Sequence, residues 1–520
     1  MKKNIFFSKE SLFILFLFLF SLLINQHYAN RGAFPHDSFA HFETGFRVLF
    51  GEHPFKDYWI VSGPFIDYLQ GLFFYLFGVN WQVYVFHAST INAIVTVSTF
   101  IVFRNFGLNV FYSFLYSLFF SILAYPSSGT PFVDHHSTFF SLLGIYALLL
   151  GIKKEKNSYW ILLPIFFICA FLSKQVPASY IIVSIIIILS FYSFDKKKYN
   201  WFKPFFLSGA LFIIFLLFFG YINGISLSSF LEQYIFYPQS IAENRFENFK
   251  ISPLGLAGHF KFIFLSLLLL FYINCKNFFT INKYYKQKKF YYFLILFFFS
   301  ISLIFHQIFT RNQTFIFFLI PILVAFSHIY LGKIRPIFHF LIVLFCLFVT
   351  IKYHFRFNEG RKFHELINSN FELALDAKKI DHKLTGLKWI TPQFNNNPGA
   401  EILIINKIKK ILQNDKRKKM VLSNYPFFSV ILEKKFFSTT RWHIFDGTDY
   451  PQVGNEYFLS YQNLFVNVLR ENNIKVIYTI FPVKKSNIYD YINKNCFKEE
   501  EISEYIASYE LKLCKELNFP

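Results

Sequence analysis

Apolar residues fill long uninterrupted stretches of this chain, and most charged residues lie in the connections between them. A helix needs about 20 mostly apolar residues to cross a bilayer, and eleven stretches approach that length. They lie near residues 11–27, 81–103, 108–124, 137–152, 158–173, 177–194, 203–222, 259–275, 290–306, 314–331 and 335–352. The pattern predicts a polytopic α-helical membrane protein with about 11 transmembrane helices.

The composition supports an integral membrane protein, since 54% of the 520 residues are hydrophobic and only 16% are charged. A net charge of +21 could indicate nucleic-acid binding. Lys and Arg gather in alternate connections, however, such as 153–156, 195–203 and 276–289. Cytoplasmic loops collect these residues, so topology explains the charge without a nucleic-acid partner. We therefore expect a cytoplasmic N-terminus and an extracytoplasmic C-terminal region.

The sequence after about residue 353 has the mixed, charged pattern of a globular region. Residues 418–423 and 474–480 predict buried strands, and 401–413 and 462–471 predict amphipathic helices. We therefore expect a membrane domain over 1–352 and a C-terminal α/β soluble domain over 353–520. Cys496 and Cys514 lie in this second region, where a disulfide or two free thiols are both reasonable.

The segment 28–80, between the first two candidate spans, is dense in groups able to do chemistry. It contains His36, Asp37, His41, Glu43, Arg47, Glu52, His53, Lys56, Asp57 and Asp67. A loop that only joined two helices could be far shorter. Residues 65–79 are apolar but interrupted by Asp67 and Gln70, which favours an interfacial helix over a further span. We hypothesise that this outer loop carries a catalytic carboxylate.

Two further candidates lie at the outer ends of spans. Asp134, followed by His135 and His136, could hold a divalent metal or orient an acceptor; the alternative is a helix N-cap beside two interfacial histidines. Adjacent histidines point in different directions on a helix, which disfavours a shared ion. Lys174 could stabilise a phosphate, or its side chain could simply reach the interface.

The remaining polar candidates are scattered along later segments. Arg245 and Arg311 could bind phosphate or be solvated loop cations, whereas His306 is expected to be a packing or interfacial residue. Residues 441–443 and 446–449 form a polar, aromatic patch that could bind sugar or form a surface turn. The sequence contains no Gly-rich phosphate loop, which argues against a nucleotide-sugar donor or an ATP-driven pump.

Taken in order, four segments resemble the GT-C superfamily of polyprenyl-phosphate-sugar glycosyltransferases, in the style of bacterial protein O-mannosyltransferases and aminoarabinose transferases. Asp37 precedes FETGFRVLFGEHPFKDYW, and WIVSGPFIDYLQGLFFYLFG follows at once and resembles the family's interfacial helix. FVDHHSTFFSLLGIYALLL resembles the second outer loop and fourth span, and FICAFLSKQVP resembles the family's motif ending in Thr-Lys. One departure is Ser62-Gly63-Pro64, where relatives carry Lys or Glu before paired prolines.

This resemblance implies a glycosyltransferase of the bacterial inner (plasma) membrane, with a polyprenyl-phosphate-sugar donor and a glycan, lipid or protein acceptor. Asp37 matches the family's catalytic aspartate and would be the general base, although a helix cap is the alternative. Asp134 is the second catalytic candidate. Substrate-binding candidates are His36, Lys56, Asp57, His135, Lys174, Arg245 and Arg311. A transporter or flippase of lipid-linked sugars, or an O-antigen polymerase or ligase, remains the alternative function.

Overall fold

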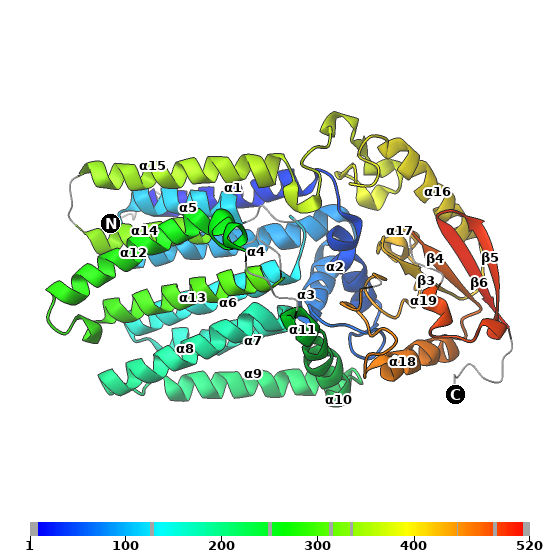
Figure 1. Cartoon of the computed structure of the whole chain (residues 1–520), viewed down its shortest axis with the longest axis horizontal. Coiled ribbons are helices and arrows are strands. Elements are labelled where there is room, and N and C mark those ends of the chain that lie inside the picture. Colours follow the sequence, from blue (N-terminus) through cyan, green and yellow to red (C-terminus); the bar gives the residue numbers. More distant parts are fainter. Residues whose placement is uncertain are drawn as a thin grey trace, which may run out of the picture.

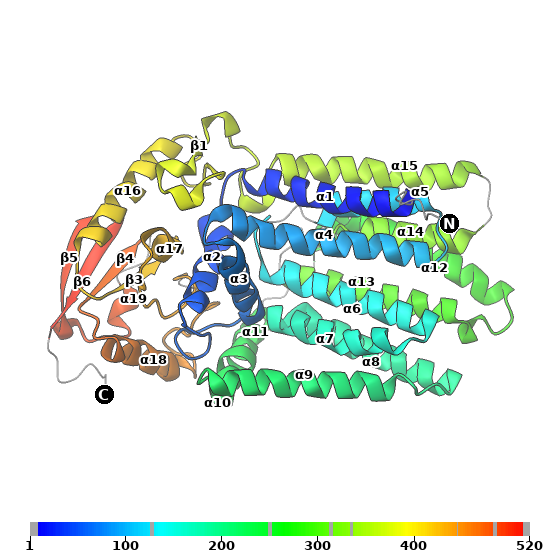
Figure 2. The same ribbon diagram turned by 180° about the vertical axis from the view of Figure 1, so that it is seen from behind.

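A computed structural model describes residues 9–124, 129–247, 252–310, 316–332, 336–444, 446–481 and 486–512. Long helices form a bundle at one end of the molecule, and a smaller region with a β-sheet lies at the other end (Figure 1). Helices α2 (Pro35–Leu49) and α3 (Pro64–Phe77) lie between the two parts, as the reverse view also shows (Figure 2).

Each of the eleven predicted apolar segments coincides with a helix. These are α1 (Lys9–Ala29), α4 (Trp81–Asn105), α5 (Val110–Ala124), α6 (Val133–Lys154), α7 (Asn157–Ser173), α8 (Gln175–Lys196), α9 (Phe202–Ile222), α12 (His259–Thr280), α13 (Lys288–Thr310), α14 (Leu319–Leu331) and α15 (Pro336–Tyr353). Among the described residues, eight helices are long and apolar enough to cross a membrane, while α5, α7 and α14 are shorter apolar helices. The chain is therefore a multi-pass helical membrane protein, as predicted.

The loop after α1 folds into a helical hairpin. Proline occupies the first turn of both α2 and α3, where its fixed φ suits a helix start. Helix α3 buries Asp67 and Phe74 while Tyr75 and Leu76 expose 75% and 58% of their surface. Its exposed apolar side is compatible with the interfacial position that the sequence predicts. Shorter helices α10 (Leu227–Leu231) and α11 (Tyr237–Glu247) follow α9, and they lie at the same end of the bundle as α2 and α3 (Figure 1).

The C-terminal region contains a four-stranded sheet in the order β3-β4-β6-β5. Strands β3 (Lys419–Ser423) and β4 (Val476–Ile480) are parallel, and β6 (Ile506–Leu511) is antiparallel to both β4 and β5 (Phe497–Ser503). The helices are α16 (Pro398–Asn414), α17 (Phe428–Leu432), α18 (Phe458–Glu471) and α19 (Ser486–Tyr489). Both predicted strands and both predicted helices are present, which confirms the α/β character. Cys496 is disulfide-bonded, and Cys514 lies outside the described residues.

The C-terminal region shares its hydrophobic core with the first loop. The Phe39 ring lies 5.1 Å from Trp81, 6.0 Å from Trp389 and 4.9 Å from Phe427, measured between ring centroids. The backbone N–H of Gly32 donates to the carbonyl of Lys388, in the short strand β2 (Lys388–Trp389), which pairs with β1 (Leu375–Asp376). The division at residue 353 stays a prediction, but the loop and the C-terminal region fold against each other.

Candidate active site

Three helix ends bring Asp134, Lys174 and His306 together. Asp134 lies in the first turn of α6, Lys174 lies between α7 and α8, and His306 lies in the last turns of α13. The Lys174 Nζ is 2.7 Å from Asp134 Oδ2, and the His306 Nε2 is 2.7 Å from Asp134 Oδ1. Asp134 and His306 side chains expose only 4% and 1% of their surface, against 21% for Lys174. Lys174 is therefore the member of the cluster that an incoming ligand can reach.

The position and hydrogen bonds of Asp134 argue against the N-cap interpretation. Phe132 occupies the N-cap position of α6, so Asp134 lies one step inside the helix and its oxygens engage Lys174 and His306. Phe34 likewise occupies the N-cap of α2, with Asp37 in the first turn. Both carboxylates are in positions that the helix dipole favours, but the capping alternative does not describe either of them.

Asp37 lies within electrostatic reach of this cluster. Its side chain exposes 22% of its surface, and its Oδ1 is 3.8 Å from His36 Nε2. Burial, and then the negative charge of Asp134, raise the pKa of Asp37 to about 7, while Lys174 acts in the opposite direction. A carboxyl group with this pKa exchanges a proton near neutral pH and is still reached by solvent from one side.

His36 faces acidic groups from the C-terminal region. Burial lowers the pKa of His36 to about 4, and the charges of Glu365 and Asp446 oppose this shift. His36 is therefore neutral at neutral pH. Asp446 belongs to the patch that the sequence marked as a sugar-binding candidate, and its Oδ1 accepts a hydrogen bond from the Thr448 N–H at 2.9 Å. Glu365 carried no signal in the sequence, because its approach to His36 depends on how the C-terminal region packs.

A second polar network lies beside the first, around Asp67 of α3. The Asp67 carboxylate accepts hydrogen bonds from His41 Nδ1 at 2.7 Å, from Tyr58 Oη at 3.1 Å and from the Thr44 hydroxyl. Arg441 Nη2 lies 3.5 Å from its Oδ2. Burial alone would raise the pKa of Asp67, but Arg441 and the hydrogen bond from His41 outweigh it, so this pKa lies below its ordinary value.

Other predicted site residues lie away from this cluster or outside the described side chains. Lys56 Nζ donates to the Asn223 carbonyl at 3.1 Å and so joins the loop to the end of α9, whereas Asp57 accepts the His53 N–H at 2.6 Å within the loop. Arg245 lies on α11, but its side chain, like the whole of Arg311, is outside the described residues.

The histidines after Asp134 point away from it. His135 Nε2 lies 2.9 Å from the Ala124 carbonyl, and His136 Nε2 lies 3.1 Å from His87 Nε2. Within the part of the chain that the structure describes, no group of three or more His, Cys, Asp or Glu side chains could hold a metal ion. The geometry thus offers no described ligand set for the divalent metal considered from the sequence.

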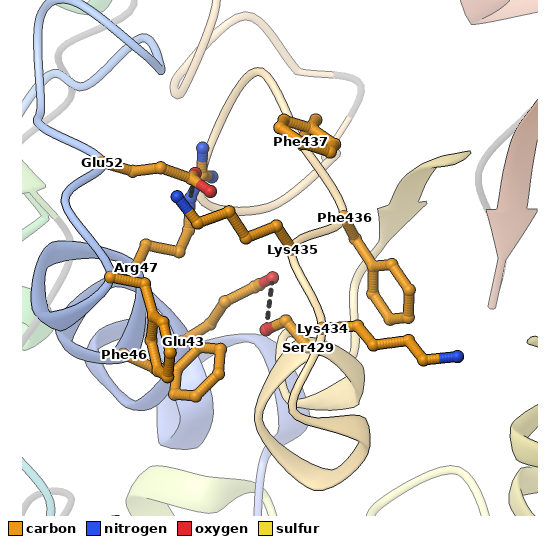
Figure 3. A pocket seen from close by; sticks show the side chains of 10 residues that line it. Glu43, Phe46, Arg47, Glu52, Ser429, Lys434, Lys435, Phe436 and Phe437 are labelled. Atoms are coloured by element: carbon orange, nitrogen blue, oxygen red, sulfur yellow. Dashed lines mark hydrogen bonds and ion pairs between the residues drawn. The ribbon is translucent and has the colours of Figure 1, made fainter. Parts of the chain in front are cut away.

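A small recess separates α2 from the segment after α17 (Figure 3). Ser429 Oγ donates to Glu43 Oε1 at 2.9 Å across it, and Arg47 Nε donates to Glu52 at 2.7 Å. Burial raises the pKa of Glu43 to about 7. Figure 3 shows Lys435 extending toward Glu52. This recess is a second place where the first loop contacts the C-terminal region.

Sequence reasoning did not assign roles to two residues that complete these networks. His306 was expected only to pack, yet it binds Asp134 across 172 residues of sequence. Arg441 was placed in a patch that could bind sugar or form a surface turn, whereas its side chain is fully buried with Nη2 3.5 Å from Asp67 Oδ2. Neither partnership has a local signature, because each joins segments far apart in the chain.

Comparison with known families gives one match. Residues 53–222 match the family model described as dolichyl-phosphate-mannose-protein mannosyltransferase. The matched segment contains Asp134 and Lys174, whereas Asp37 and His306 lie outside it. No curated protein matches the chain. Over about a third of its length, this multi-pass helical protein is therefore similar to membrane glycosyltransferases of the mannosyltransferase type, which confirms the resemblance seen in the sequence.

Proposed function

We propose that this protein transfers a sugar from a polyprenyl-phosphate donor to a hydroxyl group of a lipid, glycan or protein acceptor. The reaction would take place at the outer face of a bacterial inner membrane, with the N-terminus in the cytoplasm. The observation that carries the proposal is the placement of Asp37, whose pKa is raised to about 7, within electrostatic reach of the Asp134–Lys174 pair. Sugar transfer from a lipid phosphate requires a proton acceptor and a cation in one site, and Asp37 and Lys174 influence each other electrostatically.

Asp37 serves as the general base. Its carboxylate takes the proton of the acceptor hydroxyl while the acceptor oxygen forms a bond to the anomeric carbon of the sugar. The bond between this carbon and the phosphate oxygen breaks, and its electron pair leaves with the polyprenyl phosphate. Direct displacement by one nucleophile inverts the anomeric centre. A base with a pKa of about 7 is well matched to work near neutral pH.

Lys174 serves as the cation for the departing phosphate. An ammonium group has three N–H donors, and Asp134 accepts one of them at 2.7 Å. The remaining donors belong to a partly exposed side chain, so they can bind phosphate oxygens as negative charge develops there. Asp134 acts through Lys174, because its two oxygens are engaged by Lys174 and His306.

A transfer assay tests this function. Purified protein in liposomes is given radiolabelled polyprenyl-phosphate sugars, and transfer to extracted envelope acceptors is compared between the wild type and Asp37→Asn. Loss of a general base should lower the rate about 10²- to 10⁴-fold. Asp376→Asn is the matched control, since Asp376 only accepts a backbone N–H at the start of a short helical turn. Full transfer by Asp37→Asn would remove Asp37 from its role, and translocation of the donor without transfer would favour a flippase.

A further inference from the structure

The segment 61–63, which precedes α3, is held from two sides. Gln175 Nε2 donates to the Val61 carbonyl at 2.7 Å, and Arg441 Nη2 donates to the Ser62 carbonyl at 2.8 Å. Gln175 directly follows Lys174 in the sequence. The carbonyls of Val61 and Ser62 therefore connect Gln175, the neighbour of the proposed phosphate-binding Lys174, to Arg441 of the C-terminal region.

Gly63 is the point where these elements converge. Its φ of +78° is in the left-handed region that favours glycine. A Cβ atom at this position would lie 2.7 Å from His41 Cε1, 2.9 Å from Val133 Cγ1 and 3.2 Å from Arg441 Nη2. Val133 directly precedes Asp134. The Arg441 guanidinium therefore lies in space that a side chain at position 63 would need. His41 of α2 and Val133 of α6 border the same space.

Arg441 is also linked to α2, the helix that carries Asp37, through Asp67 of α3. Its Nη2 lies 3.5 Å from Asp67, which accepts a hydrogen bond from His41 at 2.7 Å. His41 is four residues beyond Asp37, so both lie on the same face of α2, one turn apart. The Arg441 guanidinium is therefore linked to two elements of the site. It is linked to α2, which carries Asp37, through Asp67 and His41, and to the start of α8, next to Lys174, through segment 61–63.

The burial of Arg441 is costly in isolation. The side chain is fully buried, and among the described residues its Nε and Nη1 have no hydrogen-bond partner. Burying a charge is unfavourable unless close partners compensate it, and an apolar side chain of similar size would fill the same volume. The guanidinium adds the contacts with Ser62 and Asp67, a position 5.2 Å from the centre of the Trp442 ring, and an electrostatic attraction to Asp449.

We propose that Arg441 is a positioning residue that fixes the placement of Asp37 relative to the Asp134–Lys174 pair. This inference rests on the proposed function. It makes the C-terminal region a structural part of the active site, because that region supplies the cation beside Gly63.

The first test measures transfer kinetics of Arg441→Met and Arg441→Lys in the full-length protein. Displacement of the two halves by about 1 Å can cost about 100-fold in rate, so kcat per folded Arg441→Met should fall about 10- to 100-fold. The donor KM should change little, because Lys174 is still present. Arg441→Lys should recover part of the loss, and guanidinium ions should partly restore kcat of Arg441→Ala. Arg417→Met is the control, since Arg417 is exposed and pairs with Asp415.

An unchanged kcat of folded Arg441→Met would overturn the inference, and so would a loss that only follows the fraction of folded protein. A second test needs no donor and therefore separates this inference from the proposed reaction. Asp37→Asn should raise the melting temperature at pH 8, because it removes a partly buried charge that the negative charge of Asp134 disfavours. That increase should shrink in the Arg441→Met background if Arg441 holds Asp37 in place. Equal increases in both backgrounds would contradict the inference, even if the wild type transferred no sugar.

Discussion

Asp37 and Asp67 are carboxylates of the same loop, between α1 and α4, and their surroundings give them opposite properties. Asp67 is fully buried and accepts hydrogen bonds from three side chains, with Arg441 close by, and its pKa lies below the ordinary value. Asp37 is partly exposed and lies near another carboxylate, and its pKa is raised to about 7. Burial pushes both pKa values upward, so the compensating partners decide the outcome.

Under the proposed function, this difference separates a structural carboxylate, Asp67, from the proposed base, Asp37. A carboxylate whose lone pairs are all engaged holds helices together but cannot accept a further proton easily. A carboxylate with few donors costs stability and is available for chemistry. Asp134 lies between these two cases, since Lys174 and His306 each engage one of its oxygens.

The largest expected effect is on stability, from Asp67→Asn. The substitution removes the carboxylate that lies 3.5 Å from the buried Arg441 guanidinium, and breaking a buried pair typically costs about 3–5 kcal/mol. The melting temperature in detergent should fall strongly. Asp37→Asn should raise it instead: the pKa of Asp37 in the folded protein lies above its ordinary value of 3.8, so its charge opposes folding increasingly as the pH rises toward 7. Melting-temperature shifts of the same sign for Asp67→Asn and Asp37→Asn would contradict the difference between the two carboxylates.

The next largest effect is expected on catalysis, from Lys174→Met. Loss of a hydrogen bond to a charged group costs about 1.5–3 kcal/mol, or roughly 10- to 150-fold in kcat/KM. Lys196→Met is the control, because Lys196 lies at the other end of α8 and pairs with Asp195. A rate equal to that of the wild type would show that Lys174 only neutralises Asp134.

The pH dependence of transfer gives a sharper version of the comparison. Below the pKa of Asp37, about 7, the ionised fraction falls about tenfold per pH unit, so the rate should fall with it and level off above pH 7. The residual rate of Asp37→Asn should be flat across this range. Glu43→Gln is the essential control, because burial also raises the pKa of Glu43 to about 7. The decrease in transfer rate below pH 7 should be the same in Glu43→Gln as in the wild type.

The smallest effect is expected from Lys56→Ala. Its exposed ammonium donates to the Asn223 carbonyl, and surface substitutions usually change stability by less than about 0.5 kcal/mol. Transfer kinetics should stay within about twofold of the wild type. A large rise in the donor KM would instead place Lys56 at the phosphate and weaken the case for Lys174.

Hydrophobic pattern was sufficient for the helices and for the central strands β3 and β4, because each is an apolar stretch of the right length. It was insufficient for β5, whose sequence Phe497–Ser503 is mostly charged and exposed at the sheet edge. Asp134 and Lys174 could be singled out as candidates because each flanks a recognisable apolar segment, and Asp37 because it follows the first apolar segment and matches the family resemblance.

His306 and Arg441 could not be given their roles from the sequence. Their partners lie 172 and 374 residues away, and only the packing of α13 and of the C-terminal region brings them close. A polar or charged residue at the end of an apolar helix or in a loop is often simply exposed to solvent. The local sequence does not distinguish such a residue from one that is buried against a distant partner.

The common core of the first loop and the C-terminal region has a consequence for biogenesis. Glu43 and Ser429, which bind each other across this contact, are 386 residues apart. At 5–20 residues per second the ribosome needs roughly 20 to 80 s to make the intervening chain. Throughout that time the apolar face of α2 lacks the C-terminal residues that bury it in the folded protein. Cells that make this protein must therefore protect the nascent loop, and a chain that stops before the sheet would present its aromatic residues to quality-control proteases.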